Sequence, residues 1–329
     1  MIEGATRQAM EGVDEGYGWG DLKILAGTAN PHLAGRIASE LGLQVTDMEV
    51  RRFADGELDV KVRESMRGHD VFVVQPTCHP VNENLVELAL ILDALKRASA
   101  RRVTAVLPYY GYARKEKKTQ PREPISAKLV ANVIALAGAN RVMLLDLHTE
   151  AIEGFFDVPV DHLTAQKLLA NYVRQKGLAQ LVVVAPDVGS TRRARSMARL
   201  LDAPMAIIDK RRPRDDVMEV MHVIGDVAGL NAVVIDDMIT TGGTVSSVAK
   251  ALREKGSLSV HVAATHGVFT AVAAEQLLAA PIVEVVVTDS IPIPPGALGP
   301  KLTVLPVAPL LAECIRRVHQ NRSVTELFW

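Results

Sequence analysis

The sequence has few cysteines, no long apolar run and almost no net charge, and each shortage excludes a class of protein. Its two cysteines, Cys78 and Cys314, cannot build a disulfide framework in 329 residues. No apolar stretch approaches the roughly 20 residues of a membrane span. The net charge of −1 gives no reason to expect nucleic acid or anionic membrane as the main partner. We therefore expect a cytoplasmic globular protein.

Several motifs of common enzyme classes are also missing. The chain contains neither the GxxxxGK[ST] string of a Walker phosphate loop nor the GxGxxG string of a dinucleotide fold. No serine or cysteine is placed as a nucleophile, and no close spacing of His, Cys and carboxylates indicates zinc. The first 20 residues are polar and contain several glycines, so we expect a mobile tail and no signal peptide.

Strand and helix patterns alternate from Leu22 almost to the end, which predicts an α/β fold with mainly parallel sheets flanked by helices. A strand at 22–26 precedes a helix at 31–41, with Asn30 as its cap and Gly42 as its stop. A helix is expected near 82–98, and Ser126 is expected to cap the next one. The second half repeats the theme without a solenoid period, so two similar domains are predicted.

The stretch 232–244 carries the clearest functional signal. Apolar residues at 232–235 predict a buried strand that ends in two carboxylates, Asp236 and Asp237. The small loop that follows, before a helix at 245–255, can turn backbone N–H groups toward a phosphate; it consists of Thr240, Thr241, Gly242, Gly243 and Thr244. Carboxylates repel an anion but accept hydrogen bonds from vicinal hydroxyls or bind a metal. The order of these parts favours a ribose 5-phosphate site over a loop with solvated acids.

Polar residues recur directly after apolar strands. They are Asp146, His148, Asp187, Lys210 and Asp236. Each alone is as easily a solvated loop residue, but ligands of open α/β sheets bind at the carboxyl ends of the strands. The recurrence therefore predicts one shared site.

Two basic stretches predict contacts to phosphates. The segment 108–128 is rich in lysine and arginine and is broken by proline and glycine, as a mobile lid over a polyphosphate would be. The turn at 209–214 packs Lys210 among arginines that repel one another without an anion between them. Polyphosphate beside carboxylates in turn suggests Mg²⁺.

Taken together, the strings FADGE, VNENLVEL, PYYGYAR, PISAKLVAN, DLHTEAIEGFFDVPVDHL and IDKRRPR, with the loop at Asp236, resemble the ribose-phosphate pyrophosphokinases of the common bacterial and animal class. The resemblance covers nearly all of the chain after the N-terminal tail. It implies that the protein is a ribose-phosphate diphosphokinase of nucleotide biosynthesis. Such an enzyme transfers the pyrophosphoryl group of MgATP to the 1-hydroxyl of ribose 5-phosphate. It also implies two phosphoribosyltransferase-like domains at 21–162 (ATP side) and 163–307 (ribose 5-phosphate side), a tail at 1–20, and a segment at 308–329 that packs on the first domain. The expected assembly is a homohexamer.

The resemblance also implies roles for single residues. Lys210 and Arg212 would be catalytic, with Arg212 also reaching ribose 5-phosphate, and His148 and Asp187 would be linked to Mg²⁺. Asp236, Asp237 and the loop from Thr240 to Thr244 would hold ribose 5-phosphate. ATP would be bound by two groups of residues, one of them from a neighbouring subunit: Phe53, Asp55, Gly56 and Glu57 from the neighbour, and Arg114, Lys115 and His148 from the same chain.

The sequence departs from the family pattern at three places. Lys115 and Glu116 stand where glutamine followed by aspartate is common, Thr240 where aspartate is usual, and Ser190 where a second glycine is usual. Thr240 matches phosphoribosyltransferases more closely, so an enzyme that consumes the same product is an alternative. That alternative does not explain the basic stretches at Arg114 and Lys210. A non-catalytic phosphoribosyl-binding subunit is the other alternative.

Overall fold

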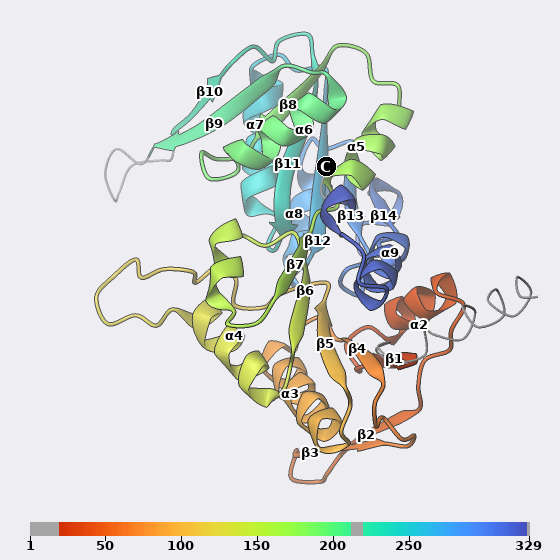
Figure 1. Cartoon of the computed structure of the whole chain (residues 1–329). Helices are drawn as coiled ribbons and strands as arrows, with labels where there is room; N and C mark the ends of the chain where they lie inside the picture. Colours follow the sequence, from red (N-terminus) through yellow and green to blue (C-terminus); the bar gives the residue numbers. More distant parts are fainter. Residues whose placement is uncertain (1–19, 212–219, 328–329) are drawn as a thin grey trace, which may run out of the picture.

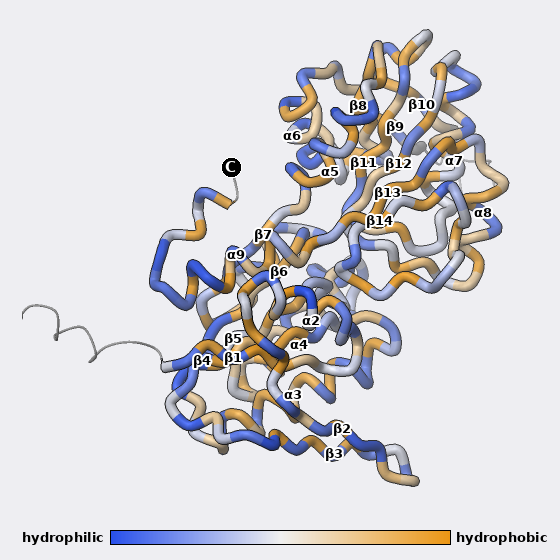
Figure 2. The backbone as a smooth tube through the Cα atoms, turned by 90° about the vertical axis from the view of Figure 1, so that its right-hand side faces the viewer, coloured by the Kyte–Doolittle hydropathy of each residue, from blue (hydrophilic) through white to orange (hydrophobic). Residues whose placement is uncertain are grey.

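The structure is a computed structural model that describes residues 20–211 and 220–327, without the side chains of residues 210, 211 and 220. It contains two large sheets, one from each half of the chain (Figure 1). Figure 2 shows apolar residues concentrated along the strands, as expected for sheets buried between helices.

The first sheet has five strands, all parallel. Their order is β1 (Leu22–Ala26), β4 (Asp70–Val74), β5 (Arg102–Leu107), β6 (Arg141–Leu145) and β7 (Val160–Leu163). Helices α3 (Val81–Arg97) and α4 (Ser126–Ala137) pack on one face, and α2 (Pro31–Glu40) and α9 (Ala308–His319) pack on the other. An antiparallel hairpin of β2 (Met48–Arg52) and β3 (Leu58–Val62) projects beside it.

The second sheet has seven strands, all parallel except for the edge strand β10. Their order is β10 (Val220–Ile224), β9 (Met205–Arg211), β8 (Leu181–Ala185), β11 (Asn231–Ile239), β12 (Ser259–Gly267), β13 (Glu284–Thr288) and β14 (Leu302–Leu305). Helices α7 (Gly243–Glu254) and α8 (Ala273–Ala279) cover one face, and α5 (Gln166–Gln175) and α6 (Thr191–Leu201) cover the other. The predicted α/β class with mainly parallel sheets flanked by helices is confirmed.

The C-terminal helix α9 returns from the second sheet to pack against α2 of the first. A buried ion pair lies beneath it: Arg102 donates to both carboxylate oxygens of Asp70, at 2.8 and 2.5 Å. Arg102 also donates to the carbonyl of Val318, and His319 lies 2.9 Å from Asp70. Because Asp70 is fully buried, these contacts satisfy a carboxylate that would otherwise be costly to bury.

The predicted N-cap was right at α2 and wrong at α4. Asn30 accepts a hydrogen bond from the N–H of Leu33 and caps α2, and Gly42 follows its end with φ +72°. Ser126 does not cap α4, because it is already the first helical residue and Ile125 occupies the cap position without a side-chain hydrogen bond. Within the described part of the chain, no helix is long and apolar enough to cross a membrane.

The predicted strand at 232–235 is too short. Strand β11 extends to Ile239, because its ladder with β12 continues through Met238↔His266 and Ile239↔Gly267. The two carboxylates therefore lie within the strand and not after it. Lys210, expected directly after a strand, likewise lies inside β9, where its backbone is paired with Met221.

Candidate active site

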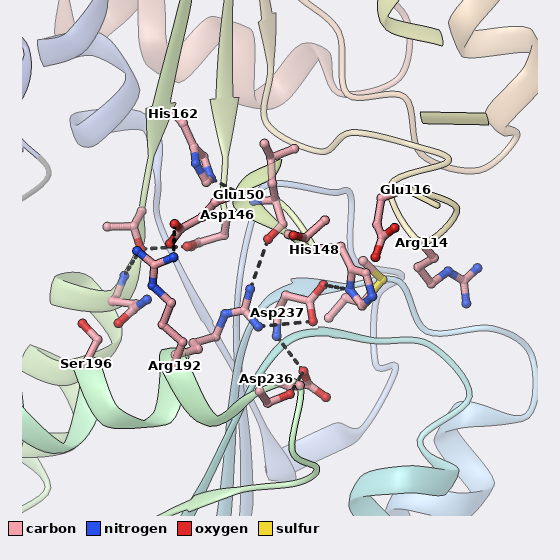
Figure 3. A pocket seen from close by; sticks show the side chains of 18 of the residues that line it. Arg114, Glu116, Asp146, His148, Glu150, His162, Arg192, Ser196, Asp236 and Asp237 are labelled. Atoms are coloured by element: carbon pink, nitrogen blue, oxygen red, sulfur yellow. Dashed lines mark hydrogen bonds and ion pairs between the residues drawn. The ribbon is translucent and has the colours of Figure 1, made fainter. Parts of the chain in front are cut away.

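A cleft of about 1460 Å³ opens where the carboxyl ends of the two sheets face each other (Figure 3). Figure 3 shows Arg114 and Glu116 on one side, Arg192 and Ser196 on the opposite side, and Asp236 and Asp237 between them. Most of the residues predicted from strand ends and from the stretch 232–244 line this cleft, as does Arg114 of the basic segment 108–128: Asp146, His148, Asp187, Asp236, Asp237, Thr240, Thr241, Gly242 and Thr244.

The phosphate-type loop between β11 and α7 has a backbone conformation that requires glycine at position 242. Gly242 adopts φ +79°, and a Cβ there would lie 2.9 Å from the Cγ atom of Leu277. Helix α7 begins at Gly243 with no side-chain cap and no acidic residue in its first turn. The N–H of Gly243 donates to Thr241 Oγ1 at 3.4 Å. The helix N-terminus still presents a partial positive charge to an anion in the cleft.

The adjacent carboxylates Asp236 and Asp237 both line the cleft, and Asp237 is the more deeply buried of the two. Asp237 is 3% exposed and contacts two groups from elsewhere in the chain. His148 Nδ1 lies 2.8 Å from Asp237 Oδ2, and Arg193 Nη1 lies 3.5 Å from Asp237 Oδ1. Its assignment to ribose 5-phosphate stays a prediction, since the carboxylate already serves these partners.

The protonation of this pair follows from its contacts. Burial opposes the charge of Asp237, but the hydrogen bond with His148 and the nearby Arg193 outweigh it and lower the pKa of the carboxyl. The same hydrogen bond raises the pKa of His148 against the opposing effect of burial. An ionised Asp237 accepts the Nδ1 proton, and Nε2 of His148 remains for a ligand.

This contact predicts a pH-dependent contribution of His148 to stability. A pKa that is raised on folding adds stability that is complete below the unfolded value, about 6.5, and is lost as pH rises through the folded value. The difference in unfolding free energy between the wild type and His148→Ala should therefore shrink from pH 6 toward pH 9, as measured by urea unfolding across this range at roughly one-unit steps. A difference that grows with pH would contradict the assigned pairing.

Asp236 and Asp187 line the cleft, and the hydrogen bonds given below come from neutral groups and not from charged side chains. Burial and the neighbouring charge of Asp237 raise the pKa of Asp236, whose Oδ1 accepts from the N–H of Asp237 and from Ser190 Oγ at 2.9 and 3.3 Å. Asp187 Oδ1 accepts from the N–H of Ser190 at 2.8 Å. Ser190 has φ −82°, so this position does not need the conformational freedom of the usual glycine.

Asp187 offers the carboxylate oxygens that Mg²⁺ prefers, and His148 would add one ring nitrogen. His148 offers Nε2 while a carboxylate fixes its other nitrogen, an arrangement typical of metal-binding histidines. In the described residues no group of three or more His, Cys, Asp and Glu side chains is arranged for a metal. Mg²⁺ keeps most of its waters and binds beside substrate phosphates, so a two-residue anchor is compatible with it.

Other predicted site residues lie outside the cleft. Phe53, Asp55, Gly56 and Glu57 form the exposed turn between β2 and β3, in the first half of the chain and away from the cleft. Phe53 is 51% exposed there. Lys115 is turned toward its own loop, where its ammonium lies 2.9 Å from Glu123. Gly243 starts α7 just behind the lining residues. Arg212 and the side chain of Lys210 lie outside the described residues.

Sequence reasoning missed the arginines of α6. Arg192, Arg195 and Arg199 line the cleft together with Ser196, and their spacing of three and four residues places them on one face of the helix. Arg193 lies deeper and is 16% exposed. The available signal was the string TRRARSMAR, a helix start without an acidic residue that follows the Asp187 loop directly.

Comparisons with known proteins decide the family. The family model described as the N-terminal domain of ribose phosphate pyrophosphokinase matches residues 22–138, and that of the phosphoribosyl synthetase-associated domain matches residues 212–329. A ribose-phosphate pyrophosphokinase of Caldanaerobacter subterraneus is 52% identical over 93% of this chain and 98% of its own length. The chain belongs to the ribose-phosphate pyrophosphokinase family.

Relatives in this family include a plant protein and a solved bacterial structure. Ribose-phosphate pyrophosphokinase 1 of Spinacia oleracea is 52% identical over 93% of this chain and 92% of its own length. The crystal structure of phosphoribosylpyrophosphate synthetase from Mycobacterium smegmatis matches with a TM-score of 0.87 and 46% identity, over 92% of this chain and 99% of that one. The resemblance stated from the motifs is thereby confirmed.

Proposed function

We propose that this protein is a ribose-phosphate diphosphokinase, which converts ATP and ribose 5-phosphate into 5-phosphoribosyl 1-pyrophosphate and AMP. The observation that carries the proposal is the junction of a phosphate-type loop, a half-buried Asp236 and the His148–Asp237 pair in one cleft, in a chain whose relatives carry the pyrophosphokinase name over most of their length. The same names speak against the two alternatives, a phosphoribosyltransferase and a non-catalytic subunit.

The reaction needs positioning and charge neutralisation more than a strong base. The 1-hydroxyl oxygen of ribose 5-phosphate attacks the β-phosphorus of ATP, the bond between the β-phosphorus and the α–β bridging oxygen breaks, and AMP leaves with that oxygen. The hydroxyl proton passes to solvent. No nucleophile from the protein is required.

The residues would bind ribose 5-phosphate at one end of the cleft and the ATP phosphates at the other. The N–H groups at the start of α7 and the hydroxyls of Thr240, Thr241 and Thr244 would bind the 5-phosphate, and Asp236 would accept hydrogen bonds from the ribose hydroxyls. Arg114 would meet the ATP phosphates from the opposite side. Bound at His148 and Asp187, Mg²⁺ would neutralise charge on the transferred phosphates. Lys210 and Arg212 would stabilise that charge in the transition state.

A second subunit would complete the binding site for the adenosine of ATP. The turn with Phe53, Asp55, Gly56 and Glu57 is exposed and distant from the cleft of its own chain, so it would serve a neighbour's site. The assembly we propose is a homohexamer with ATP sites shared between subunits, and the proposed location is the cytoplasm.

Product analysis tests the proposed reaction. A ³¹P NMR spectrum of protein, Mg²⁺, ATP and ribose 5-phosphate should gain the two coupled resonances of a pyrophosphate on the sugar while those of ATP decline. A phosphoribosyltransferase would leave ATP unchanged, and this outcome would refute the proposal.

Replacing Asp236 with alanine tests the ribose end of the site. The change removes the acceptor for the ribose hydroxyls, so the KM for ribose 5-phosphate should rise roughly 10- to 50-fold while that for ATP changes about 2-fold or less. Initial rates at varied ribose 5-phosphate and varied ATP give both constants. Asp226→Ala, at a residue outside the cleft, is the matched control. A defect confined to ATP would show that the loop has been assigned to the wrong substrate.

A further inference from the structure

Arg193 is the most buried of the arginines that line the cleft, and both of its hydrogen bonds leave its own helix. Its Nη2 donates to the carbonyl of Leu147 at 3.1 Å, and its Nη1 lies 3.5 Å from Asp237 Oδ1. Leu147 follows a strand of the first sheet, whereas Asp237 lies in a strand of the second. The guanidinium thus bridges the two halves of the molecule at the cleft.

Both contacts lead to His148. The Leu147 carbonyl belongs to the peptide bond that enters His148, so the first contact fixes the backbone before the ring. The Asp237 carboxylate holds ring atom Nδ1 at 2.8 Å, so the second contact fixes the group that orients the ring. On the other side of Leu147, its N–H donates to His162 Nε2 at 3.0 Å, and His162 is held in turn by Glu153.

The two contacts of Arg193 use the shape of the guanidinium as well as its positive charge. A planar guanidinium presents its N–H donors in fixed, diverging directions, and here two of them serve acceptors on different sheets. A lysine ammonium brings the same charge and three donors, but all of them lie on one nitrogen atom, so it reproduces the two separate N–H contacts of the guanidinium only in part. Losing the charge would also leave Asp237, of which 3% is exposed, with His148 as its remaining charged partner.

We propose that Arg193 is a positioning residue: it holds the His148 ring in place by fixing both the peptide bond before the ring and the carboxylate that binds it. This inference rests on the proposed function for its kinetic consequence, but not for its structural one. Arg193 acts through Asp237 and Leu147, and it differs from a simple cross-link between the halves because both of its acceptors adjoin His148.

A second cross-link offers the control for that difference. Arg36 on α2 pairs with Asp289, which follows β13, at 2.5 Å, and this ion pair also joins the two halves. Neither residue lines the cleft. Arg36→Gln therefore removes an arginine–aspartate contact between the two halves without touching His148.

The kinetic test compares Arg193→Gln, Arg193→Lys and Arg36→Gln in the full chain. Arg193→Gln should lower kcat about 10- to 100-fold and change the KM for ribose 5-phosphate about 3-fold or less, because the loop and Asp236 keep their contacts. Arg193→Lys should recover part of the loss, and Arg36→Gln should retain kcat within about 2-fold. Equal losses of kcat in Arg193→Gln and Arg36→Gln would overturn the proposal.

A spectroscopic test of the protein without substrates separates this inference from the proposed function. In ¹⁵N-histidine spectra, the signals of His148 are identified by their loss in His148→Ala. Arg193→Gln and Arg193→Lys should shift or broaden the His148 Nδ1 signal, whereas Arg36→Gln should leave it in place. Far-UV circular dichroism confirms that each variant is folded, and Arg193→Lys carries the test if the glutamine variant is not. Unchanged His148 signals in a folded Arg193 variant would refute the positioning role, whatever the activity of the wild type.

Discussion

Replacing Lys210 with alanine is expected to lower kcat by at least ~100-fold while substrate binding changes much less. A cation that neutralises charge on the transferred pyrophosphoryl group acts most strongly in the transition state, so its loss appears mainly in kcat. Steady-state kinetics give kcat, and equilibrium binding of ribose 5-phosphate gives the ground-state affinity. Equal losses in kcat and in affinity would instead assign Lys210 to ground-state binding.

Two variants sharpen the Lys210 test. Lys210→Arg keeps the charge and should recover part of the rate, since arginine also neutralises phosphate charge. Lys250→Ala removes an exposed lysine of α7 that does not line the cleft, and it should retain kcat within about 2-fold. A comparable loss in Lys250→Ala would mean that overall charge and not position governs the effect.

Replacing Asp237 with alanine is expected to impair both stability and activity. The change leaves Arg193, which is 16% exposed, without its carboxylate, and removes the acceptor of His148. Breaking a buried ion pair by removing one partner costs about 3 kcal/mol. Urea unfolding should show this loss, and kcat should fall about 100-fold because the His148 ring is no longer held.

A double-mutant cycle controls for the loss of packing in the Asp237 variants. Asp237→Asn keeps the size of the side chain but brings an amide donor toward His148 or Arg193, so it should also be destabilised, though less than alanine. If Asp237 and Arg193 act as one unit, the losses of Asp237→Asn and Arg193→Gln will not add in the double variant. Additive losses of stability and kcat would contradict the joint role of the two residues.

The sequence predicted the fold because its local signals agree with the tertiary structure. Apolar runs such as those of β4 and β8 are buried on both faces, and these runs alternate with amphipathic helices. The end of β11 was misplaced because two carboxylates suggest a loop. In the structure β12 continues the ladder beside them, and this pairing with residues about 28 positions away has no local signature.

The site was predictable where chemistry follows a strand end within one segment. The loop after β11, with Gly242 at positive φ, was predicted in this way. His148 and Asp187, which follow other strands, were predicted in the same way, and both line the cleft. The burial of Arg193 was not predictable, because the arginines of a helix are usually exposed to solvent and only the approach of Leu147 and Asp237 from distant segments covers this one.

The most direct test of pyrophosphoryl transfer is the identity of the nucleotide released from ATP. With Mg²⁺ and ribose 5-phosphate, the protein should release AMP in a one-to-one ratio with the ribose 5-phosphate consumed, as followed by chromatography of the nucleotides, and release should stop when either the sugar or Mg²⁺ is omitted. Release of ADP would indicate transfer of a single phosphoryl group, and either that result or the absence of AMP would contradict the proposed pyrophosphoryl transfer.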